Sequence, residues 1–320
     1  MKLIILISST ALIILLSLFF GAADLSLPQT LQALIGNGRD NDVIIVQELR
    51  LPRALLGAVI GAGLGASGAA LQGYTRNPLA APGILGFTSC AALGAVIALY
   101  FGFSQAVPVA ALIGTALGAL LILQIAGPRK GASTLILAGV GVGALATALT
   151  GLIMNFAPNP WALSEIVYWL MGSLKNAEMG GLMICAPLTV LGIALLLFIG
   201  PDLRTLSLGE ETATSLGVSL TKVRTLLIAG TALCVGSGVA IAGAIGFIGL
   251  FVPHIIRLIF GPDPMKLIPL SAIGGAGFLV FADIITRTLT GPGTQLYLGI
   301  LTSLIGVPFF LYLAVKETRT

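Results

Sequence analysis

The chain has 320 residues, of which 57% are hydrophobic and only 9% are charged, and its mean hydropathy is +1.07. A soluble core does not need so apolar a composition, whereas a lipid bilayer does, so the sequence predicts a polytopic membrane protein. The formal net charge is +4. Because the basic residues are spread over short loops, a nucleic-acid-binding patch is excluded.

Apolar runs near the ~20 residues needed to cross hydrocarbon predict about ten helical spans. The first run is read as a retained span, because its apolar core of about 18 residues is longer than that of a cleaved signal peptide. The short run at 247 to 260 predicts a short or tilted helix packed against protein. In chain order, the expected spans cover 3 to 22, 54 to 73, 84 to 103, 106 to 127, 134 to 156, 180 to 200, 225 to 246, 247 to 260, 267 to 289 and 296 to 315.

The distribution of lysine and arginine predicts the orientation of these spans. With both termini in the cytoplasm, most of the 16 basic residues fall at or near the cytoplasmic side. The exceptions, which this topology leaves outside, are Arg39, Arg50, Arg53, Lys175 and Arg287.

A polar segment at 201 to 224 interrupts the apolar sequence on the cytoplasmic side. Within it, Leu206 to Gly217 reads as a short helix, because Glu210 and Glu211 suit a positive N-terminal end and Gly217 suits a left-handed stop. A short helix held between two spans could transmit the movement of a cytoplasmic partner to those spans.

Glycine at four-residue spacing predicts close helix packing in lipid. Three stripes of this kind occur, namely Gly57, Gly61 and Gly65, then Gly114 and Gly118, and then Gly139 and Gly143.

No residue pattern predicts a catalytic or metal site. Cys90, Cys185 and Cys234 lie in or beside apolar runs without a Cys-x-x-Cys pair, and the single histidine, His254, reads as a packing residue. Ser67 lacks the pattern of a nucleophile elbow. The chain is therefore not expected to be an enzyme, and it is expected to bind neither a metal nor a cofactor.

The energy source is also expected to lie outside the chain. No lysine follows a glycine, so a phosphate-binding loop of the Gly-Lys-Ser/Thr type is excluded. Asp283 is the acid that falls convincingly inside an expected span, and a structural pair with Arg287, one helical turn on, accounts for it as well as an ion relay does. An external ATPase is the favoured motor, with an ion-coupled secondary transporter as the alternative class.

Five segments together carry a family resemblance. In order, they are 47 to 53 (QELRLPR), 68 to 86, 209 to 217, 242 to 254 and 298 to 310. They resemble the FecCD/BtuC family, permeases of ABC importers for iron-siderophores, haem and cobalamin, over nearly the whole chain. The resemblance implies an all-α integral membrane fold of the BtuC-like type II class, with about ten transmembrane helices and inverted repeats. It implies one permease domain over 1 to 320, in a bacterial or archaeal cytoplasmic (inner) membrane.

The resemblance also implies roles for particular residues. The segment 209 to 217 resembles the coupling helix that docks on the ATP-binding subunit. Arg50, Arg53 and Arg287 match arginines that meet acidic residues of the binding protein. Ala132 and Ser133 align with a cytoplasmic gate. Met171 and Gly172 are candidates for the outer mouth of a pathway that runs between two permease copies and is lined largely by spans five and ten. The implied coupling residues are Leu208, Gly209, Glu210, Glu211, Thr212, Ala213, Leu216 and Gly217.

A weak internal echo is consistent with inverted repeats. Arg53-Ala-Leu-Leu followed by Gly63-Leu-Gly65 resembles Arg224-Thr-Leu-Leu followed by Gly236-Ser-Gly238. The two segments begin on opposite faces of the membrane, so spans two to five are expected to match spans seven to ten.

The resemblance implies partners and a cargo. The partners are a second permease copy, identical or paralogous, two ATP-binding subunits that use ATP and magnesium, a substrate-binding protein outside the membrane, and lipid. The expected cargo is a bulky metal chelate, foremost a ferric siderophore, with cobalamin, haem or a molybdate-type oxyanion as alternatives.

Overall fold

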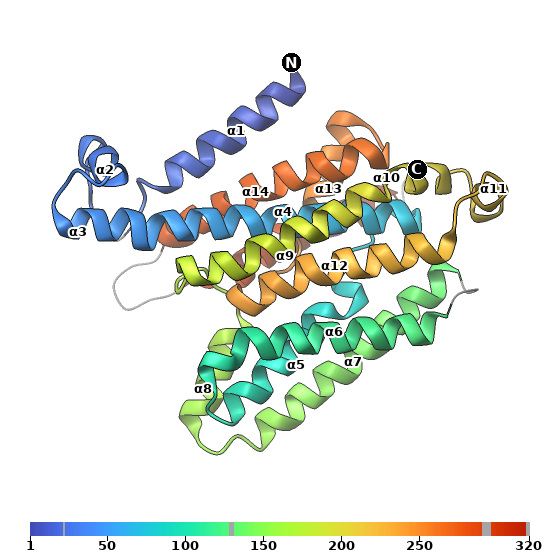
Figure 1. Ribbon diagram of the computed structural model, residues 1–320, viewed down its shortest axis with the longest axis horizontal. Coiled ribbons are helices and arrows are strands. Elements are labelled where there is room, and N and C mark those ends of the chain that lie inside the picture. Colours follow the sequence, from blue (N-terminus) through green and yellow to red (C-terminus); the bar gives the residue numbers. More distant parts are fainter. Residues whose placement is uncertain (22, 128–130, 290–295, 318–320) are drawn as a thin grey trace.

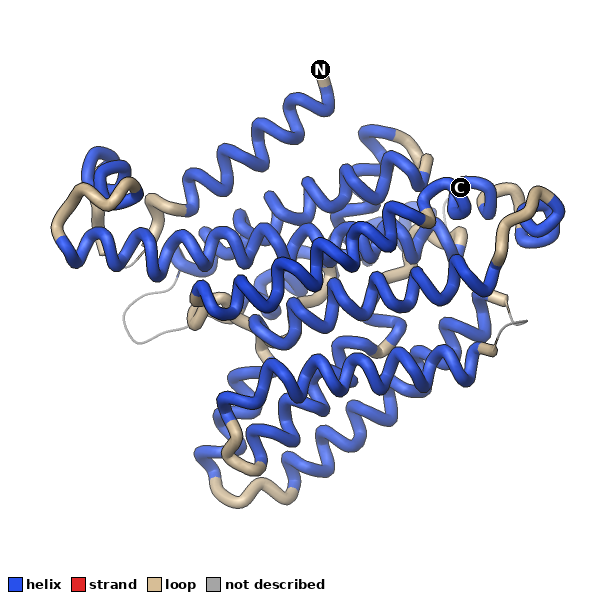
Figure 2. The backbone as a smooth tube through the Cα atoms, in the orientation of Figure 1, coloured by secondary structure: helices blue, strands red, loops and turns tan. Residues whose placement is uncertain are grey.

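The computed structural model describes the chain except for residues 22, 128–130, 290–295 and 318–320, and it leaves the side chains of 312–317 undescribed. Every regular element in the described part is helical, as Figure 2 shows. Each of the ten expected spans contains one main helix. These helices are α1 (Lys2–Ser17), α4 (Leu51–Thr75), α5 (Phe87–Tyr100), α6 (Val107–Ala126), α7 (Ala132–Asn155), α9 (Met179–Phe198), α12 (Leu220–Ala242), α13 (Ile248–Phe260), α14 (Pro264–Leu289) and α15 (Leu298–Glu317).

The spans are of two kinds. Six helical stretches in the described residues are long and apolar enough to cross a membrane, and the longest is a continuous one at Asp40–Thr75 that contains α4. The helices α1, α5, α13 and α15 give shorter apolar stretches. The expected short helix at 247 to 260 is therefore confirmed as α13, and α5 is equally short.

Short elements lie at the ends of the spans. Before α4 come α2 (Leu27–Leu34), α3 (Asp40–Val43) and a π-helical segment (Ile44–Arg50). Two 3-10 turns, Pro82–Leu85 and Ser104–Ala106, precede α5 and α6. Further along the chain are α8 (Pro160–Leu170), α10 (Gly200–Leu206) and α11 (Glu210–Ser215). The sequence predicted α11 but did not predict α2 or α8.

Each of the three glycine stripes contains a close contact between helix backbones, as predicted. A Cβ atom at Gly61 of α4 would lie 2.2 Å from the carbonyl oxygen of Gly275 on α14, and a Cβ at Gly275 would lie 2.1 Å from that of Gly61. Gly114 of α6 faces the backbone of α5 at Cys90 in the same way. Gly139 of α7 faces the backbone just before α5. These pairs bring backbones together without side chains between them, which is how membrane helices gain packing energy.

The helices α4 to α7 and α12 to α15 share a packing pattern that is consistent with the expected inverted repeat. The helix α4 packs on α14 and α13, and α12 packs on the corresponding α6 and α5. The residues just before the short helices α5 and α13, Gly86 and Phe247, both take the left-handed conformation, with φ of 71° and 64°. Figure 1 shows α4 and α12 at the centre of the molecule, with α14 beside α4 and α6 beside α12.

The molecule has two opposite ends, seen at the left and right of Figure 1. We call them the α2 end, which also holds α3, and the α11 end, which also holds α10. The start of the chain is held toward the α11 end, because the Lys2 amine donates to the Ile259 carbonyl at 3.1 Å, near the end of α13. Just after α13, Oδ1 of Asp263 lies 3.9 Å from Nε of Arg204 in α10.

Candidate functional site

The helix α11 has a well-defined start and stop. Gly209 precedes it with φ of 112°, a conformation that favours glycine. At its other end Gly217 has φ of 89° and donates to Thr214, while Val218 donates to Ala213, both at 3.0 Å. These two hydrogen bonds form a Schellman motif, so the predicted glycine stop is confirmed.

The segment around α11 is fixed to the spans on one side and exposed on the other. Leu203 and Leu206 of α10 are fully buried, and α10 packs on α14 and α4. Ala213 of α11 is also buried. In contrast, Leu208 and Leu216 are 65% and 63% exposed, on either side of α11. These two exposed leucines lie in the segment where the sequence predicts that a cytoplasmic partner docks.

The structure brings the predicted coupling helix next to the predicted gate. Gly131 is the N-cap of α7, and Ala132 and Ser133 are its first two residues. A Cβ at Gly131 would lie 3.6 Å from one carboxylate oxygen of Glu210 on α11 and 3.7 Å from the other. Movement of α11 would therefore bear directly on the first turn of α7.

A second connection joins α12, the helix after α11, to the end of α6. Arg224, near the start of α12, is buried and donates to the Tyr74 hydroxyl at 3.1 Å and to the Ala126 carbonyl at 3.2 Å. It also donates to the Gly127 carbonyl at the end of α6. The sequence pattern flagged Arg224 as part of the repeat but did not assign it this role.

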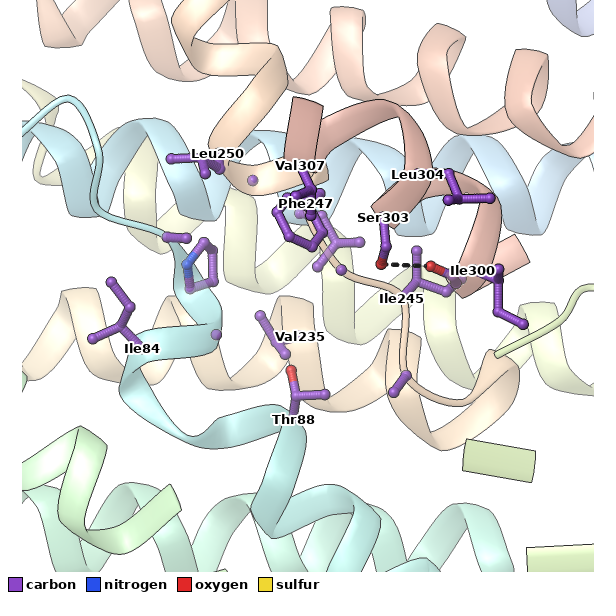
Figure 3. Close-up of a pocket in the computed structure, with 18 of the residues that line it drawn as sticks. Ile84, Thr88, Val235, Ile245, Phe247, Leu250, Ile300, Ser303, Leu304 and Val307 are labelled. Carbon is purple, nitrogen blue, oxygen red and sulfur yellow. Dashed lines mark hydrogen bonds between the residues drawn. The ribbon is translucent and has the colours of Figure 1, made fainter. Parts of the chain in front are cut away.

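A cavity of about 850 Å³ lies between the two halves of the repeat. Its wall is almost entirely apolar, and Figure 3 shows Phe247, Ile245 and Ile300 around it, with Thr88 and Ser303 as hydroxyl-bearing neighbours. The Ser303 hydroxyl donates to the Gly299 carbonyl at 2.8 Å. The lining residues come from 81 to 88, from 244 to 250, from α15 and from single positions on α4, α8 and α12.

The cavity agrees only in part with the expected pathway. Span ten, α15, contributes to its wall, but span five, α7, is not among the lining elements. Sequence reasoning missed the two segments, 81 to 84 and 244 to 247, at which the α-helical structure is interrupted. The available signals were Pro82-Gly83 before α5, and Gly243 and Gly246 before α13, because these residues interrupt otherwise apolar runs.

The candidate mouth residues lie at a close junction of three segments. Met171 lines the cavity, whereas Gly172 does not. Gly172 has φ of 72°, and a Cβ there would lie 2.3 Å from the Ala244 carbonyl oxygen. The Gly172 carbonyl accepts from the Leu298 amide at 3.0 Å, which holds the start of α15 in place. Gly172 therefore positions the cavity wall, and its role at a mouth remains a prediction.

At the α2 end, the three predicted docking arginines lie in one cluster with Asp283. Arg53 and Arg287 both contact the Asp283 carboxylate, at 2.8 Å and 3.1 Å. Arg50 is 4% exposed and donates to the Leu18 carbonyl at 2.8 Å. The ion pair suggested for Asp283 and Arg287 is confirmed, and Arg53 is a second partner that the sequence did not indicate. Docking by these arginines stays a prediction.

Comparisons with known proteins agree with this arrangement. The family model described as the FecCD transport family matches residues 9–316. A cobalamin import system permease protein, BtuC of Halobacterium salinarum, is 42% identical over 276 residues, which is 84% of this chain and 73% of that protein. The hemin transport system permease protein HmuU of Yersinia pestis is 36% identical over 316 residues, covering 96% and 94%.

Among solved structures, one described as an inward-facing conformation of a metal-chelate type ABC transporter superposes with a TM-score of 0.89. It is 32% identical and covers 98% of this chain and 99% of its own. Since the family model matches almost the whole chain, and since close relatives match over most of their length, this chain belongs to the FecCD transport family of ABC importer permeases.

Proposed function

We propose that the chain is the transmembrane permease of a binding-protein-dependent importer that carries a bulky metal chelate, foremost a ferric siderophore, into the cytoplasm. In this proposal ATP is hydrolysed by two separate ATP-binding subunits that dock on α11 and its flanking leucines. The chain works with a second permease copy, either identical or a paralogue. The α11 end and both termini face the cytoplasm, and the α2 end faces the substrate-binding protein.

The proximity of Glu210 on α11 to Gly131, the N-cap of α7, is the observation that carries this proposal. A short helix with a fixed start and stop transmits a push, because it does not deform within itself. Its exposed leucines supply the partner surface, and Glu210 lies beside Gly131 at the N-cap of the gate helix.

The form of the cavity supports a bulky cargo. A space of about 850 Å³ with an almost wholly apolar wall offers few groups that could select a small ion. If the surfaces between two permease copies are as apolar as this wall, a large chelate would pass them with weak contacts, and selection would rest with the binding protein. Cobalamin, haem and a molybdate-type oxyanion remain alternative cargoes, and the oxyanion fits this wall least well.

Transport by the reconstituted complex tests the proposal. The permease, the ATP-binding subunits and the binding protein encoded beside it are placed in proteoliposomes. Uptake of a labelled ferric siderophore should require ATP and should persist with an uncoupler. Uptake that proceeds without the ATP-binding subunits and collapses with the uncoupler would establish the ion-coupled alternative instead.

The cargo is tested separately on the binding protein. Titration of the purified binding protein with ferric siderophores, cobalamin, haem and molybdate should give one class of ligand a far higher affinity than the others. A preference for one of the last three would replace the ferric siderophore in this proposal without affecting the transport mechanism.

A further inference from the structure

The arginine cluster at the α2 end contains one buried carboxylate for three guanidinium groups. Arg53, in the first turn of α4, donates from Nε to both oxygens of Asp283, at 3.1 Å and 3.0 Å, and from Nη2 at 2.8 Å. Arg287 places its Nε 3.1 Å from the second oxygen. Asp283 itself is 1% exposed. Its carboxylate is therefore shared by two arginines and is shielded from solvent.

The other donors of the cluster hold the end of α1. Arg287 donates to the carbonyls of Ser17 and Phe20 at 3.1 Å and 2.9 Å, and to the Ser17 hydroxyl at 2.6 Å. Arg50 donates to the carbonyls of Leu18 and Phe19 at 2.8 Å and 3.1 Å. It also donates to the Ala23 carbonyl. These two arginines act as structural clamps on the chain that leaves α1.

The cluster keeps a positive charge in excess. Arg53 and Arg287 contact the buried Asp283, and the exposed Asp24 interacts electrostatically with Arg50. Even when both acids are counted, one positive charge has no matching acid within the cluster. Arg53 is the arginine that a partner can reach, because its side chain is 19% exposed, against 8% for Arg287 and 2% for Asp283.

We propose that Asp283 is an internal competitor for Arg53, and that a carboxylate of the docked binding protein takes Arg53 from it. This inference rests on the proposed function and adds a step to it. Asp283 occupies Nε and Nη2 of the Arg53 guanidinium, so a partner acid that binds the same two nitrogens, which suit a bidentate carboxylate, replaces Asp283 there. Asp283 then keeps Arg287 as its counter-ion, so no buried charge is left unpaired.

The exchange makes docking weaker than it would be if Arg53 had no partner within the permease. Each docking event breaks one ion pair to form another, so its net gain comes from the excess positive charge and from the remaining contacts. A binding protein that must leave after delivering its cargo is served by such a moderate affinity.

Replacement of Asp283 by asparagine tests the inference. Asp283→Asn keeps the shape of the side chain but removes the competing charge. The permease is held in nanodiscs with its ATP-binding subunits, and the loaded binding protein encoded beside it is titrated at several salt concentrations. The variant should bind roughly two- to fivefold more tightly than the wild type, the range expected for one partly exposed ion pair. Its affinity should also fall more steeply with salt.

Two controls isolate the contact from the net charge. Glu178→Gln likewise removes one negative charge at the α2 end, before α9, but from an exposed side chain, and it should change the affinity less than Asp283→Asn does. In an Arg53→Gln background, Asp283→Asn should give no gain, because the contested arginine is absent. A lower or unchanged affinity for Asp283→Asn, or the same change in both backgrounds, would overturn the inference.

A second measurement does not depend on the folding of Asp283→Asn. In Arg53→Lys, a membrane-permeant carbodiimide should link the introduced amine to Asp283 in the free permease. Saturating loaded binding protein should replace this internal link with one to itself, as peptide mass spectrometry would show. An internal link that persists at full yield in the complex would overturn the inference. Failure of the wild type to bind the loaded binding protein would instead contradict the proposed function.

Discussion

At the scale of single residues, the space around each glycine decides whether the protein tolerates a larger side chain at that position. Gly61 and Gly275 face each other across α4 and α14 with no room for a methyl group. Gly141, in α7, is different, because a Cβ atom there would have no neighbour within 4 Å. The same substitution at Gly61 and at Gly141 should therefore have opposite effects.

Gly61→Ala should destabilise the protein, and Gly141→Ala should not. The added methyl at 61 would lie 2.2 Å from a carbonyl oxygen, so α4 and α14 must separate, at a cost of roughly 1–3 kcal/mol. At position 141, alanine should stabilise the helix by up to about 1 kcal/mol relative to glycine. Thermal unfolding in detergent, followed by size-exclusion fluorescence, measures both. Equal midpoints for the two variants would contradict the close packing of α4 on α14.

At the scale of elements, apolar length and glycine spacing were sufficient to predict the spans. Every expected span contains a helix, and the polar segment at 201 to 224 contains α11 with the expected glycine stop. The helix α2 was missed because it has only eight residues and lies outside the long apolar runs, although Ser26 and Gln29 form a capping box at its start. Such a helix depends on tertiary support, here from Gln47, whose amide donates to the Ala33 carbonyl at 3.0 Å.

The site was less predictable than the spans, for a physical reason. The role of Asp283 depends on Arg53, which is 230 residues away in the sequence, and no local pattern encodes that pairing. The cavity likewise depends on two interruptions of the α-helical structure, at 81 to 84 and 244 to 247, whose residues line the same space. The coupling segment was predictable because its helix start, its polar residues and its stop all lie within one short stretch.

The stop of α11 gives a prediction for the element. Gly217→Val should greatly reduce ATP-driven uptake, because a β-branched residue strains a backbone with φ of 89° and the Schellman motif would be lost. Membrane insertion should be unchanged, because Gly217 is exposed and has no neighbour within 4 Å of a Cβ. Uptake in proteoliposomes and the yield of purified protein measure the two effects.

A matched control for this variant is Ser215→Ala. Ser215 is also exposed at the end of α11, and its hydroxyl donates only to the Glu211 carbonyl of the same helix at 3.0 Å. It should transport normally. Full uptake by Gly217→Val would show that the geometry of this end is not needed for coupling.

At the scale of the whole molecule, the two ends are built for different partners. The α11 end exposes a short rigid helix between two leucines, which suits a partner that pushes. The α2 end holds an excess of positive charge, which suits an acidic partner that arrives and leaves. The helix α4 connects the two ends, because it starts beside Asp283 at the α2 end and contacts α10 at the α11 end. An event at either end therefore bears on the same central helix.

This division predicts opposite accessibility for two exposed positions. Ser219, just before α12, lies at the α11 end, and Asn41, in α3, lies at the α2 end. The native Cys90, Cys185 and Cys234 are buried, so a membrane-impermeant maleimide should react mainly with an introduced thiol. In intact cells Asn41→Cys should react and Ser219→Cys should not, whereas in inverted vesicles the pattern should reverse. Labelling of Ser219→Cys in intact cells would place α11 outside, where no ATP-binding subunit could reach it, and the proposed coupling would be wrong.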